Sequence, residues 1–90
     1  MSDRIEMVKK SLRIPYNDDD GLLDMIDSAS LEYVKNAVNG ENEAYLEDEL
    51  FVTATILLTQ YWYLNRGEGI ADHIPVYVTS MIQQLRGKYA

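Results

Sequence analysis

The chain has 90 residues, carries a formal net charge of −7 and contains no cysteine. Its length predicts one domain, residues 1–90, and the 47% of apolar residues is enough to build a core. The lack of cysteine excludes disulfides and thiolate metal sites, and the acidic charge disfavours a protein that grips phosphate backbones.

A short first helix is predicted near the N-terminus. No basic and apolar signal segment precedes it, which indicates a cytosolic origin. Asp3 is placed to cap this helix, and Ile5, Val8 and Leu12 share one face at helical spacing. Pro15 should end it, because the residue before a proline is pushed out of the helical region.

A second helix is predicted to start in the acidic segment at residues 17–20. Asn17 or Asp18 is the expected cap, and the acids that follow lie in the first turn, where the helix dipole favours negative charge. Two neighbouring apolar rows run from Leu22 to Val38 and make a stripe broad enough to face a core. The Asn-Gly pair at residues 39–40 should end the helix.

The third predicted helix, at about residues 46–66, is apolar on nearly all sides and follows an acidic linker. Such a helix is buried on nearly all sides, so we expect it to cross the domain over ~30 Å and to have part of its surface covered by another chain. A membrane helix would need about 20 apolar residues, and the longest apolar stretch, from Phe51 to Leu64, is shorter. Its three rows are Leu50, Ala54, Leu57, Tyr61, Leu64; Phe51, Thr55, Leu58, Trp62; and Val52, Ile56, Thr59, Tyr63.

The fourth helix should begin at Pro75, because proline is favoured in the first turn of a helix. Val78, Ile82 and Leu85 give its buried face, and the Arg-Gly pair at residues 86–87 should close it with a cation at the negative end. Together these elements predict an all-α fold. We expect a small bundle of about four helices around one long, largely buried central helix.

Little in the sequence points to catalysis. Residues 18–21 resemble the start of a calcium loop, but the glycine comes fourth after Asn17, not sixth, and two leucines follow at once. His73 has no second His or Cys with which to share a metal, and the Gly-Glu-Gly at residues 67–69 is too short for a phosphate loop. No nucleophile, base and orienting group can be combined, which predicts a protein that is not an enzyme and uses no metal or cofactor.

Three aromatic residues stand in a row at positions 61–63. On a helix they point ~100° apart. Tyr61 and Trp62 continue two apolar rows and are expected in the core, whereas Tyr63 is the best candidate for an exposed or intersubunit contact, since Tyr is favoured at interface centres. A platform for stacking bases would need interleaved basic residues, and none occurs between Glu41 and Asn65.

Taken in order, several segments resemble the head–tail connector, or adaptor, proteins of long-tailed phages and prophages. They are VKKSLRI at 8–14, DDDGLLDMIDSASLEYV at 18–34, and a hydrophobic helix ending in Tyr-x-Asn-Arg, with a loop and a Pro before the last helix, at 54–86. The resemblance spans nearly the whole chain. Two features depart from it: Pro15 stands where an acid is more usual, and only GKYA at 87–90 follows the last helix, where some relatives have a longer arm.

The resemblance implies a structural adaptor for head completion and DNA packaging, made in the bacterial host cytoplasm and located in the virion at the head–tail junction. It implies a homo-oligomeric ring of roughly a dozen subunits beneath the portal protein. The ring would extend the DNA channel without binding DNA specifically, and would dock the stopper or tail-completion protein. The candidate subunit or partner contacts are Tyr63, Asn65, Arg66, Glu68, Ile70, His73, Tyr77, Arg86, Lys88 and Tyr89.

The residues alone also fit a small acidic helical binding module that regulates or masks a basic protein partner. A negative charge equally suits a channel that lets DNA pass, since like charge opposes adhesion. The loop at residues 67–74 has two glycines and few apolar residues, so we expect it to be mobile in the isolated protein and to face the lumen or a neighbour in a ring. Asn65 and Arg66 should anchor it through the last helical carbonyls.

Overall fold

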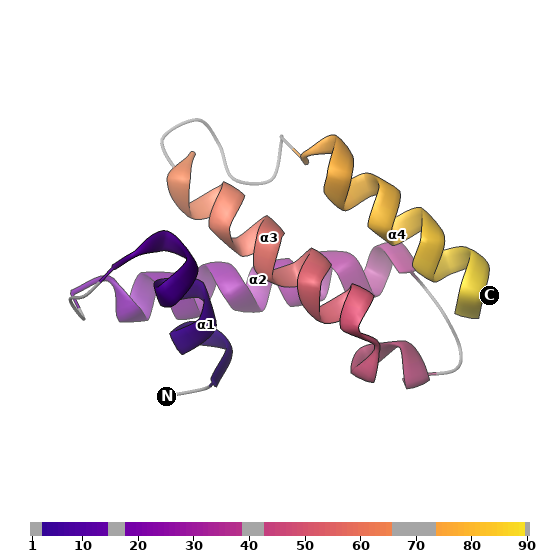
Figure 1. Cartoon of the computed structure of the whole chain (residues 1–90), viewed down its shortest axis with the longest axis horizontal. Helices are drawn as coiled ribbons and strands as arrows, with labels where there is room; N and C mark the ends of the chain where they lie inside the picture. Colours follow the sequence, from indigo (N-terminus) through magenta and orange to yellow (C-terminus); the bar gives the residue numbers. More distant parts are fainter. Residues whose placement is uncertain (1–2, 15–17, 39–42, 66–73, 90) are drawn as a thin grey trace.

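A computed structural model describes residues 3–14, 18–38, 43–65 and 74–89. Within these ranges the chain is all-α, without a strand: α1 (Asp3–Leu12), α2 (Asp20–Val38), the 3-10 helix η1 (Glu43–Glu47), α3 (Glu49–Leu64) and α4 (Val76–Tyr89). α3 crosses in front of α2, with α1 on one side of it and α4 on the other (Figure 1). Because α3 packs against each of the other helices, the predicted bundle around a central helix is confirmed.

The central helix is shorter than predicted. α3 has 16 residues, about 24 Å at 1.5 Å per residue, whereas α2 has 19. The residues predicted as linker and helix start form η1, whose Tyr45 ring packs edge-on against Phe51 with centroids 5.4 Å apart. Asp48 separates the two elements: its backbone is extended, and its carboxylate accepts a hydrogen bond of 2.8 Å from the Leu50 amide. This N-cap geometry starts α3 at residue 49.

α1 ends through a residue in the left-handed region. Arg13 has φ 59°, its amide donates to the Lys10 carbonyl at 3.2 Å, and the Ile14 amide donates to the Lys9 carbonyl at 2.9 Å. This pair of bonds is the Schellman C-cap. The Leu-Arg-Ile segment therefore ends the helix by its own backbone geometry, ahead of Pro15, which lies outside the described ranges.

The acids at the start of α2 stand where the sequence predicts, although the helix begins at Asp20 and not at residue 17 or 18. The Asp19 carbonyl accepts the helical hydrogen bond of the Leu23 amide at 2.8 Å. The predicted stop at residues 39–40 falls outside the described residues; the last helical residue is Val38.

α4 begins at Val76, one residue after the predicted start at Pro75. The Pro75 carbonyl accepts hydrogen bonds from the Val78 and Thr79 amides at 3.0 and 3.1 Å. The predicted end at residues 86–87 is wrong, because α4 continues to Tyr89. Gly87 lies inside the helix, where glycine costs about 1 kcal/mol relative to alanine. Contacts made by the two residues that follow it, described below, offset this cost.

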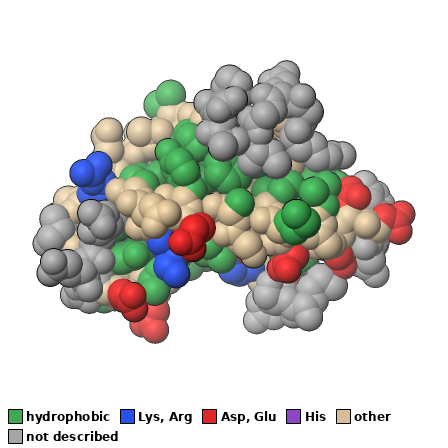
Figure 2. All heavy atoms as spheres, turned by 180° about the vertical axis from the view of Figure 1, so that it is seen from behind, with side chains coloured by type: hydrophobic (Ala, Val, Ile, Leu, Met, Phe, Trp, Pro, Cys, Tyr) green, Lys and Arg blue, Asp and Glu red, His purple; other side chains and the backbone are tan. Residues whose placement is uncertain are grey.

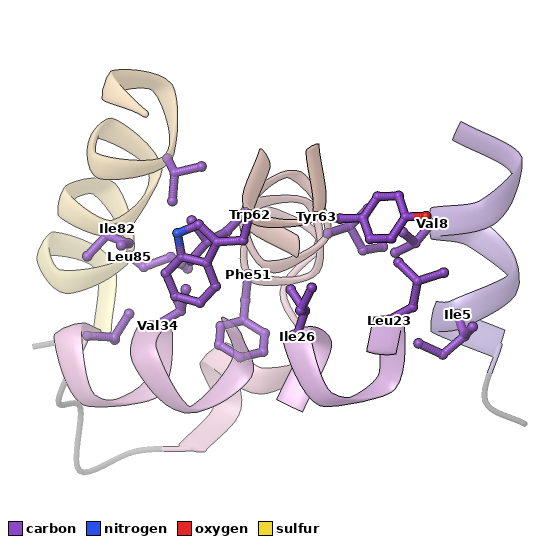
Figure 3. Packing of buried hydrophobic residues seen from close by; sticks show 14 of the residues in the cluster. Ile5, Val8, Leu23, Ile26, Val34, Phe51, Trp62, Tyr63, Ile82 and Leu85 are labelled. Atoms are coloured by element: carbon purple, nitrogen blue, oxygen red, sulfur yellow. The ribbon is translucent and has the colours of Figure 1, made fainter. Parts of the chain in front are cut away.

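All four α-helices contribute side chains to one hydrophobic cluster (Figure 3). Seen end-on, α3 stands between α4 and α1 with α2 beneath it; Trp62 points toward the α4 side and Tyr63 toward α1. Each fully buried aliphatic side chain contributes about 1.5–3 kcal/mol, more than an exposed ion pair does, so packing is the main force that joins the helices. The predicted faces of α1 and α4 are confirmed, with Ile5, Val8, Val78, Ile82 and Leu85 all buried.

Candidate subunit and partner interface

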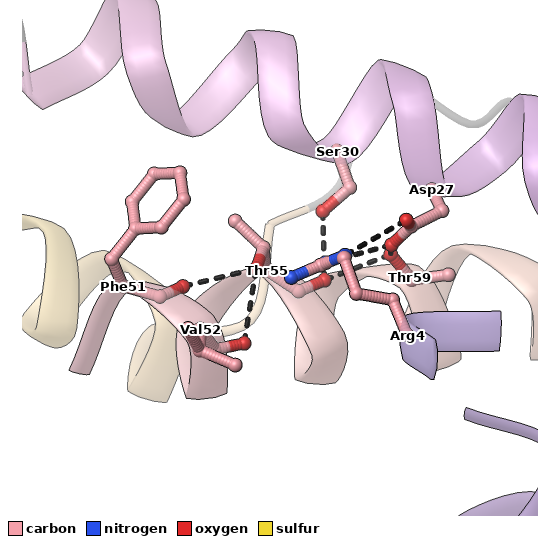
Figure 4. Close-up of polar contacts among 7 residues, drawn as sticks. All are labelled: Arg4, Asp27, Ser30, Phe51, Val52, Thr55 and Thr59. Carbon is pink, nitrogen blue, oxygen red and sulfur yellow. Dashed lines mark hydrogen bonds and ion pairs between the residues drawn. The ribbon is translucent and has the colours of Figure 1, made fainter. Parts of the chain in front are cut away.

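A polar network lies inside the core where α1, α2 and α3 meet (Figure 4). The Arg4 guanidinium donates two hydrogen bonds to the Asp27 carboxylate, at 2.9 and 2.7 Å, and Asp27 is only 4% exposed. The Thr59 hydroxyl lies 2.9 Å from the same carboxylate and 2.8 Å from the Thr55 carbonyl, and its single proton can go to either. The Ser30 hydroxyl donates to the Thr55 carbonyl at 2.8 Å.

This network fixes the rotation of α3 about its axis. A buried carboxylate is stable only when it is paired and hydrogen-bonded, so the side of α3 that carries Thr55 and Thr59 must face α2. The sequence did contain a signal for it: Asp27, Ser30, Thr55 and Thr59 are polar residues at positions within the apolar stripes of two helices. Periodicity alone does not show that they pair.

A second group of polar contacts joins the start of α2 to α1 and α3. The Lys9 ammonium lies 2.9 Å from the Asp20 carboxylate, and the Tyr63 hydroxyl donates a hydrogen bond to Asp19. The exposed position predicted for Tyr63 is therefore wrong, since this side chain is only 5% exposed. The Tyr63 ring packs on the α1 side of the core, and its hydroxyl reaches Asp19. From the sequence, the acids at the start of α2 were assigned only to the helix dipole.

A third group holds the end of α4 to the start of α3. The Asp48 carboxylate accepts hydrogen bonds from the Lys88 ammonium at 2.7 Å and from the Tyr89 hydroxyl at 2.6 Å. These two donors, Lys88 first, and the Leu50 amide hold the pKa of Asp48 well below its ordinary value. The Asp48 carboxylate in turn raises the pKa of both Lys88 and Tyr89, through the same hydrogen bonds.

Of the ten candidate contact residues, the six that the structure describes do not form one surface. Arg66, Glu68, Ile70 and His73 lie outside the described residues, as does almost all of the loop predicted to be mobile. α3 ends at Leu64, before the predicted end at about residue 66, and Asn65 is its C-cap. As predicted, Asn65 contacts the last helical carbonyls: its backbone and side-chain amides donate to the Tyr61 carbonyl at 3.0 and 2.8 Å.

The remaining candidates are on α4. Tyr77 is half-exposed, and Arg86 and Lys88 are exposed. Successive helical residues turn by ~100°, which places Tyr77 and Lys88 on nearly the same side of α4 and Arg86 on the other side. Tyr89 is partly buried, and its ring lies 6.1 Å from that of Tyr45. Lys88 and Tyr89 therefore also have roles inside the monomer.

The side of α3 that faces away from α2 carries an apolar surface that the candidate residues do not include. Leu50, Leu57 and Leu64 recur at intervals of seven residues, which brings them to one side of the helix. Leu64 is 66% exposed, and Leu50 and Leu57 are partly exposed. We call this surface the α3 face; it consists of Leu50, Thr53, Leu57, Gln60 and Leu64.

A second apolar surface lies on the outer side of α2. Met25, Ala29 and Tyr33 are all exposed and stand four residues apart, in one row along the helix. We call these three residues the α2 row. Figure 2 shows the molecule from behind, where hydrophobic side chains gather along the middle of this face and several acidic side chains stand beside them.

Among the residues that the structure describes, no three His, Asp or Glu side chains are grouped so that they could hold a metal ion. Within the same ranges, no helix combines the length and the apolar character that crossing a bilayer requires.

A small helical bundle with apolar helix faces left uncovered by its described helices belongs to the class of proteins whose surfaces are built for contact with other proteins. The sequence matches the family described as phage gp6-like head-tail connector protein over residues 2–86, and the chain belongs to that family. The resemblance predicted from the ordered segments is thus confirmed, and with it a structural role in a phage particle. No curated protein and no solved structure matches the chain.

Proposed function

We propose that the protein is an adaptor of a phage or prophage virion, which forms a ring beneath the portal protein, extends the DNA channel and docks the stopper or tail-completion protein. The observation that carries this proposal is the match to the connector family over residues 2–86. The apolar surface of α3 that no described helix covers supports it, because Leu64 is 66% exposed there and an exposed apolar side chain gains stability when another protein covers it.

The charge of the chain agrees with a channel component. A net charge of −7 disfavours adhesion of DNA, so DNA would pass through the ring without being held. Tyr77 and Arg86 are exposed and, with residues 66–73, remain the proposed contacts to the portal or to neighbouring subunits. Tyr63 is buried in the monomer and would act only by shaping the end of α3.

The test is the mass of the protein in solution across a range of concentrations, with and without the portal protein of the same phage, followed by negative-stain imaging of the largest species. A closed ring, alone or on the portal, is the expected result. Monomers under all conditions would overturn the proposal. A tight complex with a basic host protein, together with no affinity for portal, would instead support an acidic binding module.

A further inference from the structure

The α3 face is free of charge in a strongly acidic chain. α3 has one charged residue, Glu49 at its first position, and none from Leu50 to Leu64. Two copies of a chain with net charge −7 repel each other, and this repulsion is weakest where both surfaces are uncharged. The α3 face is thus the part of α3 that a second copy can approach at the lowest electrostatic cost, whereas a basic partner would gain most from contacts elsewhere.

The α3 face and the α2 row point in different directions. Ser30 and Thr55 are hydrogen-bonded across the contact between the two helices. Leu57 and Leu64 lie ~180–200° around α3 from Thr55. On α2, Met25, Ala29 and Tyr33 lie ~140°, ~100° and ~60° from Ser30, and the Tyr33 ring packs edge-on against Trp62 of α3 with centroids 6.0 Å apart. Figures 1 and 3 agree, since α2 lies on one side of α3 and no described helix covers the other side. Each copy therefore presents two different apolar surfaces that face different directions.

Two different surfaces that face different directions favour one kind of assembly. If the α3 face met another α3 face, the contact would be two-fold symmetric and would stop at a dimer. If the α3 face meets the α2 row of the next copy, every added copy leaves the same two surfaces free at the ends of the assembly. Both surfaces of every copy are then occupied only when the assembly closes into a ring.

We propose that the α3 face of one copy packs on the α2 row of the next copy. This inference rests on the proposed function, because it names the contact by which neighbouring subunits of the ring would meet. The α2 row suits ordinary helix packing, because side chains at intervals of four form a ridge that can lie in a groove between the side-chain rows of another helix.

The size of the surface indicates a weak contact. A helix of 16 residues offers a strip of roughly 240 Å², well below the ~800 Å² per partner of a stable complex. Two isolated copies should therefore not form a lasting dimer. In a closed ring each copy makes the contact twice, and closure holds the copies at a high effective concentration.

Disulfide trapping suits a weak contact, and the chain has no cysteine of its own. Leu64 and Met25 are 66% and 72% exposed, so Leu64→Cys and Met25→Cys should leave the fold intact, as circular dichroism would verify. The two single variants are mixed at high concentration and oxidised, and the double variant is oxidised alone. Leu57→Cys and Ala29→Cys extend the test along the helices, because a disulfide forms only between Cα atoms within about 7 Å.

The control is Val76→Cys, an 81% exposed apolar position on α4 outside both surfaces. The proposal predicts mixed disulfides between the α3 face and the α2 row, a ladder of multimers from the double variant, and several-fold less product from pairs that include Val76→Cys. Dimers of Leu64→Cys with itself in place of the mixed product would overturn the proposal, and so would equal trapping by the control.

The outcomes also separate this inference from the proposed function. Rings that form without any of the mixed disulfides would refute the contact and leave the adaptor role in place. If neither rings nor mixed disulfides form, with or without portal protein, both proposals fall.

Discussion

Arg13 is a single residue whose backbone carries a cost that a substitution can remove. A non-glycine residue in the left-handed region costs roughly 1–2 kcal/mol, and Arg13 has φ 59° at the C-cap of α1. Arg13→Gly should therefore raise the free energy of unfolding by about 1 kcal/mol, after the greater freedom of glycine in the unfolded chain is allowed for. Chemical denaturation measures the change. Arg13→Ala is the matched control, because it removes the charge and keeps the strain; equal stability of the two variants would contradict the argument.

The buried hydroxyls of α3 give a second prediction at the scale of single residues. Thr59 lies within hydrogen-bond distance of Asp27 on another helix, whereas Thr55 donates only to carbonyls of its own helix. Thr59→Val should lower the free energy of unfolding by about 1–2 kcal/mol, because it leaves a buried carboxylate with one donor fewer. Thr55→Val should cost less, since the helix amides already satisfy those carbonyls. Urea denaturation of both variants decides the point, and equal losses would show that Thr59 has no special partner.

Residues with a simple reason to be buried could be predicted from the sequence, and residues with a distant partner could not. Val78 and Leu85 recur on one face of α4, and their burial follows from spacing alone. Tyr63 was predicted to be exposed because two other rows already filled the expected core. Its burial depends on α1 and on Asp19, 44 residues away in the sequence, and no local pattern shows such a pair.

At the scale of elements, the contact between α4 and α3 predicts a response to pH. The pKa of Asp48 is lowered, mainly by the hydrogen bonds from Lys88 and Tyr89, from an ordinary value of 3.8. A lowered pKa means that the stabilisation is complete above pH 3.8 and is lost as the pH falls further, toward the pKa of the folded state. The melting temperature of the wild type should thus exceed that of Asp48→Asn by a constant margin between pH 7 and 5 and by a shrinking margin below pH 4.

The asparagine keeps the N-cap of α3, because its amide oxygen can still accept from the Leu50 amide. It removes the charge and the oxygen that accepts from Lys88 and Tyr89, so the comparison isolates the contact with α4. Lys88→Gln serves as the companion variant. At pH 7 its melting temperature should be lower than that of the wild type, whereas adding Lys88→Gln to Asp48→Asn should change the melting temperature little. A margin between wild type and Asp48→Asn that does not change down to pH 2 would show that Asp48 has no special stabilisation.

The elements themselves were largely predictable, and their ends were not. Apolar periodicity located all four α-helices and identified the third as central. The end of α4 was misplaced because Gly87 usually signals a stop, whereas here Asp48 holds the two residues beyond it. η1 was missed because five residues, Glu43–Glu47, give no periodic signal. The candidate interface residues stay a prediction. They do not include the leucines of the α3 face, because a core explains the spacing of those leucines equally well.

At the scale of the whole molecule, charge and apolar surface act against each other in assembly. Each copy brings a net charge of −7, which opposes association, and uncharged apolar surface on α3, which favours it. Added salt screens the first effect, since the Debye length falls from about 30 Å at 0.01 M to about 8 Å at 0.15 M, and it leaves the second intact.

Self-association of the wild-type chain should therefore strengthen as NaCl is added. Sedimentation at one protein concentration should give an average mass that rises from low salt to 0.5 M, because copies that repel at long range can then reach contact distance. A complex with a basic partner would behave in the opposite way, since screening weakens the attraction of unlike charges. Leu57→Glu is the matched variant: it adds a charge to the α3 face, so its mass should stay lower than that of the wild type at every salt concentration. An average mass that falls with salt would mean that ion pairs hold the copies together. The α3 face would then not be the contact between copies.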